Sequence, residues 1–129
     1  MPERPRVLIV DDEERFRKTL SRLLSSRGVQ VHAVDSGEAA LEHVAKQEPD
    51  VVLMDVKMPG MGGIKALAEI KRRHPAVEVL VLSGHASVDT AKEIIELGGF
   101  DYLLKPYSID DLMAKIDAAC ERKQAKYRA

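Results

Sequence analysis

The sequence predicts an α/β protein, with a parallel sheet and helices on both of its faces. Two patterns support this class. Short continuous apolar runs, typical of strands buried on both faces of a parallel sheet, alternate with longer segments in which apolar residues recur every three or four positions. This strand-helix unit occurs five times, and such alternation is characteristic of parallel sheets covered by helices.

The composition limits the classes of function to consider. The chain has 129 residues, which fits one domain, and its 45% hydrophobic and 32% charged residues are typical of a globular protein. The net charge of -1 gives no reason to expect nucleic-acid binding. The single cysteine, Cys120, excludes an internal disulfide and fits a reducing compartment. Neither a membrane span nor a secretory signal is visible, so we expect a cytoplasmic location.

The first unit comprises the apolar run Val7–Val10 and a helix that begins in the acidic stretch Asp11–Glu14. Negative charge is favourable there because the amino end of a helix carries partial positive charge. Gly28 ends this helix. Its predicted inward residues are Phe16, Leu20, Leu23 and Leu24.

In the second unit, residues 29–33 alternate between apolar and polar types, which predicts a strand nearer the edge of the sheet. Asp35 or Ser36 caps the following helix, and Pro49 marks its end. The predicted inward residues of that helix are Ala40, Leu41 and Val44.

The third unit contains a fully apolar strand, Val51–Met54, which stops at the carboxylate of Asp55. Pro59 and several glycines follow, and no strand would continue through them. A helix is expected from about Gly63 to Arg73, ended by Pro75. Its predicted inward residues are Ile64, Leu67 and Ala68. Asp55 is therefore placed at the carboxyl end of a central strand, where open α/β sheets hold their ligands.

The fourth unit begins with the strand Val77–Leu82, which ends at Ser83 and Gly84. Ser87 is a plausible cap for the next helix, which closes at the glycine pair 98–99. The predicted inward residues of this helix are Ala91, Ile94 and Ile95.

The fifth unit begins with the strand Phe100–Leu104, followed by Lys105 and Pro106. Ser108 and Asp111 have the spacing of a capping box for the last helix. Its predicted inward residues are Ile109, Leu112, Ile116 and Cys120. The basic stretch 122–129 is either a solvated helix end or the start of a linker.

Four predicted strands end in side chains that can bind ions or react. The carboxyl ends of parallel strands lie at one edge of a sheet. These side chains are Asp11 with Asp12, Asp55, Ser83 and Lys105. Three carboxylates held together repel one another unless a cation neutralises them, and Mg²⁺ prefers oxygen ligands. A lysine and a serine hydroxyl would bind a further anion. The set predicts a site for a metal ion and a phosphoryl group, with Asp55 as the nucleophile.

Each of these groups also has an ordinary structural interpretation. An aspartate at a strand end is usually a turn or cap residue, and an acidic pair at a helix start usually complements the dipole. A lysine before proline is usually a solvated loop residue. It is their common position at one edge of the sheet that favours a site.

Four motifs carry a resemblance to a known family. They are V-D-D-E at 10–13, M-D-V-K-M-P-G-M-G-G at 54–63, L-S-G-H-A at 82–86 and D-Y-L-L-K-P at 101–106. In this order and spacing they resemble the receiver domain of bacterial two-component response regulators, over about residues 6–121 of a single-domain chain, 1–129. The resemblance implies a flavodoxin-like, doubly wound five-stranded sheet of order 2-1-3-4-5, flanked by five helices. It also implies a phosphorylation-controlled signalling switch rather than an enzyme.

The resemblance assigns roles to the acidic residues. Asp55 would accept a phosphoryl group from a histidine kinase or a histidine phosphotransfer protein. Asp12, Asp55 and the backbone carbonyl of Lys57 would ligate Mg²⁺, with Mn²⁺ as an alternative. Asp11 would contribute to the metal site largely through water.

Further roles are implied for residues of the last two strand ends. Lys105 would pair with the phosphoacceptor and then with the phosphoryl group, and its bond to Pro106 would be cis. Ser83 would bind a phosphoryl oxygen, with Gly84 leaving space for the incoming group. Tyr102 would turn inward when the serine moves. Switching would remodel the face of the fourth helix, fifth strand and fifth helix, through which homodimers would also form.

The sequence departs from the family pattern at a few positions. Gly62 stands where a capping side chain is common, which costs only a few tenths of a kcal/mol but predicts a looser loop. Lys57 and His85 border the phosphoryl position and are candidates for tuning phosphoryl lifetime, although His85 also fits an exposed loop residue. The other histidines lack ligand spacing and are interpreted as solvated: His32, His43 and His74.

Two alternatives belong to other functional classes. An aspartate-nucleophile phosphatase of the haloacid-dehalogenase type also places an aspartate after a buried strand, but it needs a second carboxylate where Lys57 stands. A degenerate receiver used only for binding would not need the complete acidic set with Lys105. The motifs leave open the cognate kinase, the downstream target and whether the chain acts alone.

Overall fold

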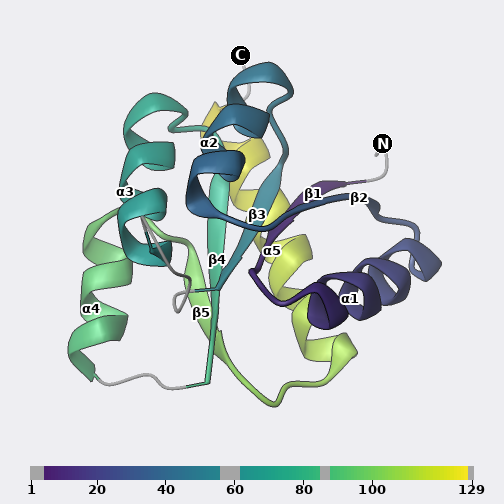
Figure 1. Cartoon of the computed structure of the whole chain (residues 1–129). Helices are drawn as coiled ribbons and strands as arrows, with labels where there is room; N and C mark the ends of the chain where they lie inside the picture. The colour runs from purple at the N-terminus through teal and green to yellow at the C-terminus, as the bar shows by residue number, and fades with distance from the viewer. Residues whose placement is uncertain (1–4, 56–61, 85–87, 128–129) are drawn as a thin grey trace.

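The computed structural model describes residues 5–55, 62–84 and 88–127, which form one five-stranded parallel sheet of order β2-β1-β3-β4-β5 and five helices (Figure 1). This arrangement confirms the predicted fold class and strand order. The strands are β1 (Arg6–Val10), β2 (Gln30–Val34), β3 (Val51–Asp55), β4 (Glu78–Ser83) and β5 (Asp101–Leu104). The helices are α1 (Glu14–Ser26), α2 (Gly37–Lys46), α3 (Gly63–Arg73), α4 (Val88–Glu96) and α5 (Ile109–Tyr127).

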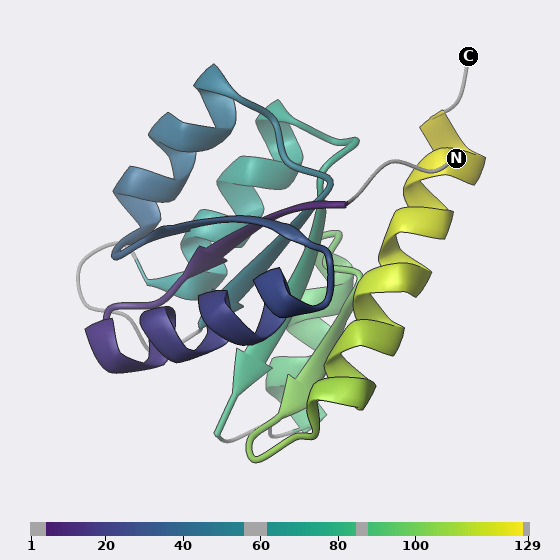
Figure 2. The same cartoon turned by 90° about the vertical axis from the view of Figure 1, so that its right-hand side faces the viewer.

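Helices cover both faces of the sheet. α1 and α5 lie on one face, and α2, α3 and α4 lie on the other (Figures 1 and 2). Successive side chains of a strand point to opposite faces. In β3, Val51 and Leu53 therefore pack with α1 and α5, whereas Val52 and Met54 pack with the other three helices. Because both faces are covered, the buried strand is apolar at every one of these positions.

Helix starts follow local rules. The Ala39 N–H donates to Ser36 Oγ at 3.0 Å, and the Asp111 N–H donates to Ser108 Oγ at 3.0 Å, so two predicted caps are confirmed. α3 instead follows Gly62, whose φ of 80° lies in the region that favours glycine. An aspartate or serine would be strained in this backbone conformation, so glycine suits the position as it is built here.

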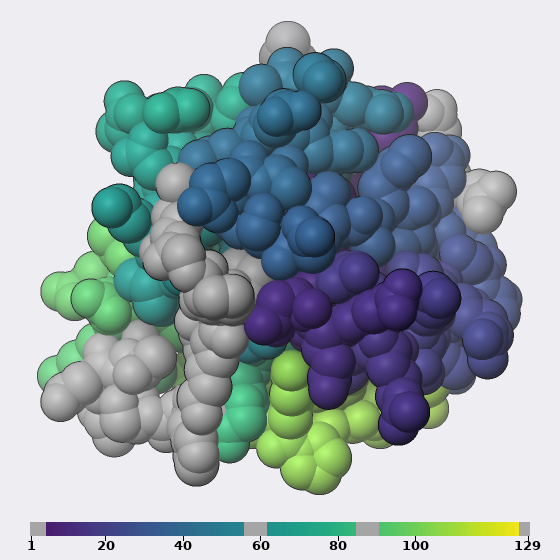
Figure 3. All heavy atoms as spheres, in the orientation of Figure 1, coloured from purple at the N-terminus to yellow at the C-terminus, as the bar shows by residue number. Residues whose placement is uncertain are grey.

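Two predicted inward residues are at the surface instead. Leu23 is 43% exposed and Ile95 is 51% exposed. Each lies next in sequence to a buried residue, Leu24 or Ile94, and neighbouring positions on a helix differ by about 100° in direction. In each pair, only Leu24 or Ile94 packs in the core against the sheet. Figure 3 shows α1 at the surface, beside the segment that follows β5.

The last helix is longer than its apolar positions indicated. The last predicted inward residue is Cys120, and α5 continues to Tyr127. Arg122 binds both carboxylate oxygens of Glu78, at 2.5 and 2.6 Å, and Lys123 Nζ lies 2.7 Å from Asp50 Oδ1. These two basic residues are therefore paired at the amino edge of the sheet rather than solvated. No helix in the described ranges combines the length and the apolarity that crossing a membrane requires.

Candidate metal and phosphoryl site

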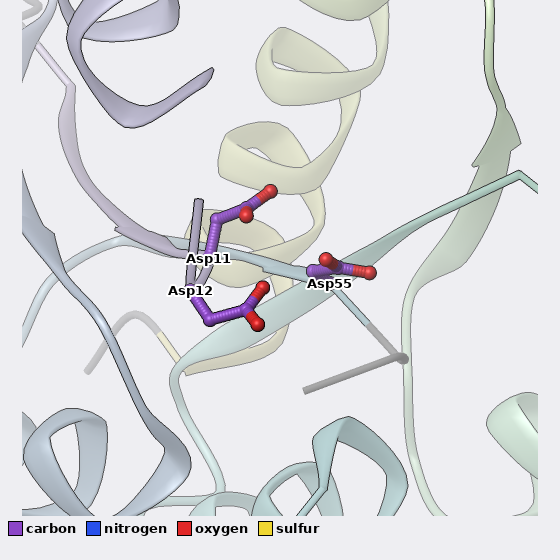
Figure 4. Close-up of side chains that lie close together, drawn as sticks. All are labelled: Asp11, Asp12 and Asp55. Atoms are coloured by element: carbon purple, nitrogen blue, oxygen red, sulfur yellow. The ribbon is translucent and has the colours of Figure 1, made fainter. Parts of the chain in front are cut away.

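Asp11, Asp12 and Asp55 lie together at the carboxyl edge of the sheet (Figure 4). β1 and β3 are neighbours, with Val10 opposite Met54, so the residues at their carboxyl ends come side by side. One carboxylate oxygen from each aspartate lies within 4.8 Å of the others. Asp11 is buried, Asp12 is exposed and Asp55 is half-buried. The predicted convergence of the three carboxylates is therefore present.

Asp11 makes hydrogen bonds with the backbone of Val34 and Glu13 and with the side chain of Arg17. Its N–H donates to the Val34 carbonyl at 3.1 Å, and its Oδ1 accepts from the Glu13 N–H at 2.9 Å. Its own carbonyl accepts from Arg17 Nη1 at 2.8 Å. These contacts fix the loop that joins β1 to α1, and with it the acidic pair.

Burial raises the pKa of Asp11 above its usual value, and the negative charges of Asp55 and Asp12 raise the pKa further. The hydrogen bond from Glu13 and the charge of Lys105 lower the pKa but do not cancel the rise. A raised pKa means that ionisation of this carboxyl is less favourable in the folded protein than in the unfolded chain. A nearby cation would favour the ionised form of this carboxyl and so offset the effects of burial and of the neighbouring carboxylates.

Lys105 follows β5 and provides a positive charge at the same edge. Its Nζ lies 3.8 Å from Asp11 Oδ2 and 4.3 Å from the centroid of the Phe16 ring. The peptide bond to Pro106 is cis, as the family resemblance implied. The ion pair described here joins Lys105 to Asp11, and the expected pairing with Asp55 stays a prediction.

Ser83 ends β4 and is 1% exposed. Its carbonyl accepts from the Lys105 N–H at 2.8 Å, so the ends of β4 and β5 are joined directly beside the acidic cluster. Gly84 is exposed, and a Cβ at that position would meet none of the described atoms within 4 Å. Tyr102 is partly buried against the core on the α2–α4 face.

Some predicted residues lie outside the part of the chain that the structure describes. These are Lys57, His85 and the expected cap Ser87. Two contacts at the site were missed by the sequence analysis, the Arg17 hydrogen bond and the Phe16 ring contact. The only signal in the sequence was that Phe16 and Arg17 lie near the start of the helix that follows the acidic pair. Helix periodicity predicted only that Phe16 packs in the core.

A groove of about 460 Å³ adjoins the site on the side of α1. Lys105 lines this groove and also pairs with Asp11 of the acidic cluster, so this residue borders both features. Exposed Leu23 lies along it. The groove is lined by Phe16, Thr19, Leu20, Leu23, Lys105, Pro106, Tyr107 and Ile109.

Comparison with known proteins identifies the family. The family model of the response regulator receiver domain matches residues 7–117. The chain belongs to this family. As a receiver domain it is a phosphoacceptor signalling switch, and the match gives no support to the phosphatase alternative.

The receiver domain resembles the corresponding part of longer regulators. It is 40% identical over 121 residues to the regulatory protein AtoC of Escherichia coli K12, which covers 94% of this chain and 26% of AtoC. It is 39% identical over 116 residues to the DNA-binding transcriptional regulator NtrC of Klebsiella pneumoniae, which covers 90% of this chain and 25% of NtrC. The chain thus spans about a quarter of the length of these curated relatives.

Solved structures agree with this assignment. The crystal structure of NtrX from Brucella abortus superposes with a TM-score of 0.88 at 30% identity, over 95% of this chain and 28% of NtrX. A CheY-like receiver domain protein from Methanospirillum hungatei JF-1 gives a TM-score of 0.91 at 23% identity, over 96% of this chain and 99% of that protein. The second likeness supports the fold alone.

Proposed function

We propose that Asp55 is the phosphoacceptor, beside a divalent cation held by Asp11, Asp12 and Asp55 itself. The observation that carries this proposal is the convergence of three carboxylates within 4.8 Å, with Lys105 Nζ 3.8 Å from Asp11. Asp55 is half-buried at the end of a central strand, where a donor can approach it. Asp11 is buried and its Oδ1 already accepts a backbone hydrogen bond, which suits a supporting role.

The donor set fits Mg²⁺, with Mn²⁺ as a substitute. Both ions take oxygen ligands, and the raised pKa of Asp11, caused by burial and by the neighbouring carboxylates, supports a cation at this position. When bound, the cation would neutralise negative charge on the transferring oxygens. The Lys57 carbonyl is proposed as a further ligand, and the Lys57 and His85 side chains as modulators of phosphoryl lifetime.

In the transfer, a carboxylate oxygen of Asp55 forms a bond to phosphorus while the bond from phosphorus to the donor nitrogen breaks. The released imidazole takes up a proton from water, and the domain keeps an acyl phosphate. Lys105 and the Ser83 hydroxyl would contact the phosphoryl oxygens. The domain would thereby catalyse only its own phosphorylation and dephosphorylation.

The switch is proposed to pass from Ser83 to the surface of α4, β5 and α5. Ser83 and Lys105 are joined through the backbone, and Tyr102 lies on the same strand that leads to Lys105. Ile95 and Leu104 are exposed, at 51% and 47%, so α4 and β5 carry apolar side chains that a second copy would bury on dimerisation.

The phosphoacceptor role is tested with acetyl phosphate and Mg²⁺, followed by intact-mass measurement. The wild-type domain should gain one phosphoryl group, and Asp55→Asn should gain none. Asp50→Asn is the matched control, because this aspartate pairs with Lys123 at the opposite edge and should leave phosphorylation intact. An adduct that persists in Asp55→Asn would contradict the proposal.

The phosphodonor is proposed to be a histidine kinase or a histidine phosphotransfer protein that seats apolar side chains in the groove beside Lys105. A partner that presents phosphorus to Asp55 must lie over this edge, and the groove shares Lys105 with the site. Leu23→Glu should slow transfer from a phosphorylated histidine kinase about tenfold, equivalent to about 1.4 kcal/mol, and leave the reaction with acetyl phosphate unchanged. Ile95→Glu on α4 is the control, because Ile95 is 51% exposed and does not line the groove. Equal slowing by both substitutions would exclude the groove as the donor surface.

We further propose that residues 1–129 form one cytoplasmic receiver domain, with a core at about 6–121 and a basic end at 122–129. The curated relatives include a DNA-binding transcriptional regulator, of which the receiver domain matches about a quarter. This domain carries a net charge of -1 and is proposed to control such an output without contacting nucleic acid itself.

A further inference from the structure

Arg17, near the start of α1, reaches back to the loop that carries Asp11 and Asp12. Its Nη1 donates to the Asp11 carbonyl at 2.8 Å, in a partly buried position. Arg17 is itself half-buried, whereas Arg15 on the same helix is exposed. The contact therefore ties the first turns of the helix to the carboxyl end of β1.

This hydrogen bond acts on the peptide between the two aspartates. The carbonyl of Asp11 and the N–H of Asp12 belong to one planar unit, so a donor on the carbonyl fixes the plane from which the Asp12 side chain leaves. Asp11 is held at its N–H and at its Oδ1 as well. Asp12 is exposed, so packing does little to set its direction.

We propose that Arg17 is a positioning residue for the divalent cation, because it keeps the carboxylates of Asp11 and Asp12 directed toward Asp55. This inference rests on the proposed function. Three neighbouring carboxylates repel one another, and without the cation they separate unless the backbone holds them. A set of ligands that is already arranged loses less freedom on binding. Arg17 contacts the backbone and so supports the site without occupying a ligand position.

The test measures cation binding directly, by the electron paramagnetic resonance signal of free Mn²⁺ with the unphosphorylated domain, and by Mg²⁺ competition. Arg17→Ala should weaken Mn²⁺ binding about tenfold, equivalent to about 1.4 kcal/mol. Arg15→Ala removes the same charge from the same helix and should change the affinity far less. Arg17→Lys keeps a charged donor and should bind with an affinity between those of the two alanine variants.

The outcomes separate this inference from the proposed function. If the wild-type domain binds no Mn²⁺, or if Asp12→Asn binds it equally well, the proposed function fails. If the wild type binds and Asp12→Asn does not, but Arg17→Ala matches Arg15→Ala, only the positioning role is overturned. A lower melting temperature of Arg17→Ala with unchanged Mn²⁺ affinity also overturns that role. Should Arg17→Ala fail to fold, Arg17→Lys decides, because equal affinity with Arg15→Ala would then refute positioning.

Discussion

The two edges of the sheet each hold a buried carboxylate, in opposite electrostatic settings. Asp11 at the carboxyl edge is 3% exposed, and Glu78 at the amino edge is 1% exposed. Glu78 receives two hydrogen bonds from Arg122 and has Lys71 Nζ 3.5 Å away. Asp11 instead lies among carboxylates, with Lys105 Nζ at 3.8 Å.

The same burial therefore has different results at the two edges. Burial raises the pKa of both carboxyls, but at Glu78 the bonds and charges of Arg122 and Lys71 outweigh burial and lower the pKa overall. At Asp11 the neighbouring aspartates add to the effect of burial. The buried carboxylate of the amino edge is paired with Arg122 and Lys71, whereas that of the carboxyl edge lies among other carboxylates, where we propose that a cation binds.

The largest expected effect is at the amino edge. Glu78→Gln should lower the free energy of unfolding by about 3 kcal/mol at pH 7, because it removes one partner of a buried ion pair. Urea unfolding measures this change. Glu42→Gln is the control, since its pair with Lys46 is exposed and should contribute less than about 0.5 kcal/mol.

The pH dependence of that difference identifies its cause. The folded pKa of Glu78 lies below its usual value of 4.5, so the stabilisation is present above pH 4.5 and is lost as the pH falls through the folded pKa. The difference in the free energy of unfolding between the wild type and Glu78→Gln should be constant from neutral pH down to about pH 4.5, and should decrease below that. An advantage that persists unchanged in strong acid would point to packing rather than charge.

A smaller effect is expected from a cation at the carboxyl edge. Mg²⁺ at ten times its Kd should raise the free energy of unfolding by about 1.4 kcal/mol, since it binds only the folded protein. Urea unfolding with and without Mg²⁺ measures the gain. Glu78→Gln should keep this gain, because its site is at the other edge, and Asp12→Asn should lose it. A gain that survives in Asp12→Asn would place the cation elsewhere.

The smallest effect has the opposite sign to the first. In a chelating buffer at pH 7, Asp11→Asn should raise the free energy of unfolding by less than the cation does, because burial and the neighbouring carboxylates disfavour the charged form of Asp11 and raise its pKa. Asparagine keeps an oxygen that can accept from the Glu13 N–H. The gain should shrink as the pH falls through the folded pKa, where Asp11 becomes protonated by itself. If Asp11→Asn destabilised the protein, the proposed electrostatic difference between Asp11 and Glu78 would be wrong.

Local pattern determined most of the fold and the identity of the acidic set. Continuous apolar runs predicted strands covered on both faces, as at 51–54, and Ser36 and Ser108 predicted helix starts. Asp11, Asp12 and Asp55 could be placed together because parallel strands bring their carboxyl ends to one edge. These inferences need only periodicity and chain direction, which short stretches of sequence carry.

Only the tertiary structure decided which charges meet. Glu78 is the one charged residue of the predicted strand Val77–Leu82, and its partner Arg122 lies 44 positions later in a stretch interpreted as solvated. Arg17 reaches the Asp11 carbonyl, and nothing in its spacing distinguishes it from its exposed neighbour Arg15. The exposure of Leu23 and Ile95 likewise depends on which side of each helix faces the sheet. Ion pairs between distant residues, and the exposure of residues at the side of a helix, depend on how whole elements pack against one another. The periodicity of a short stretch of sequence does not determine that packing.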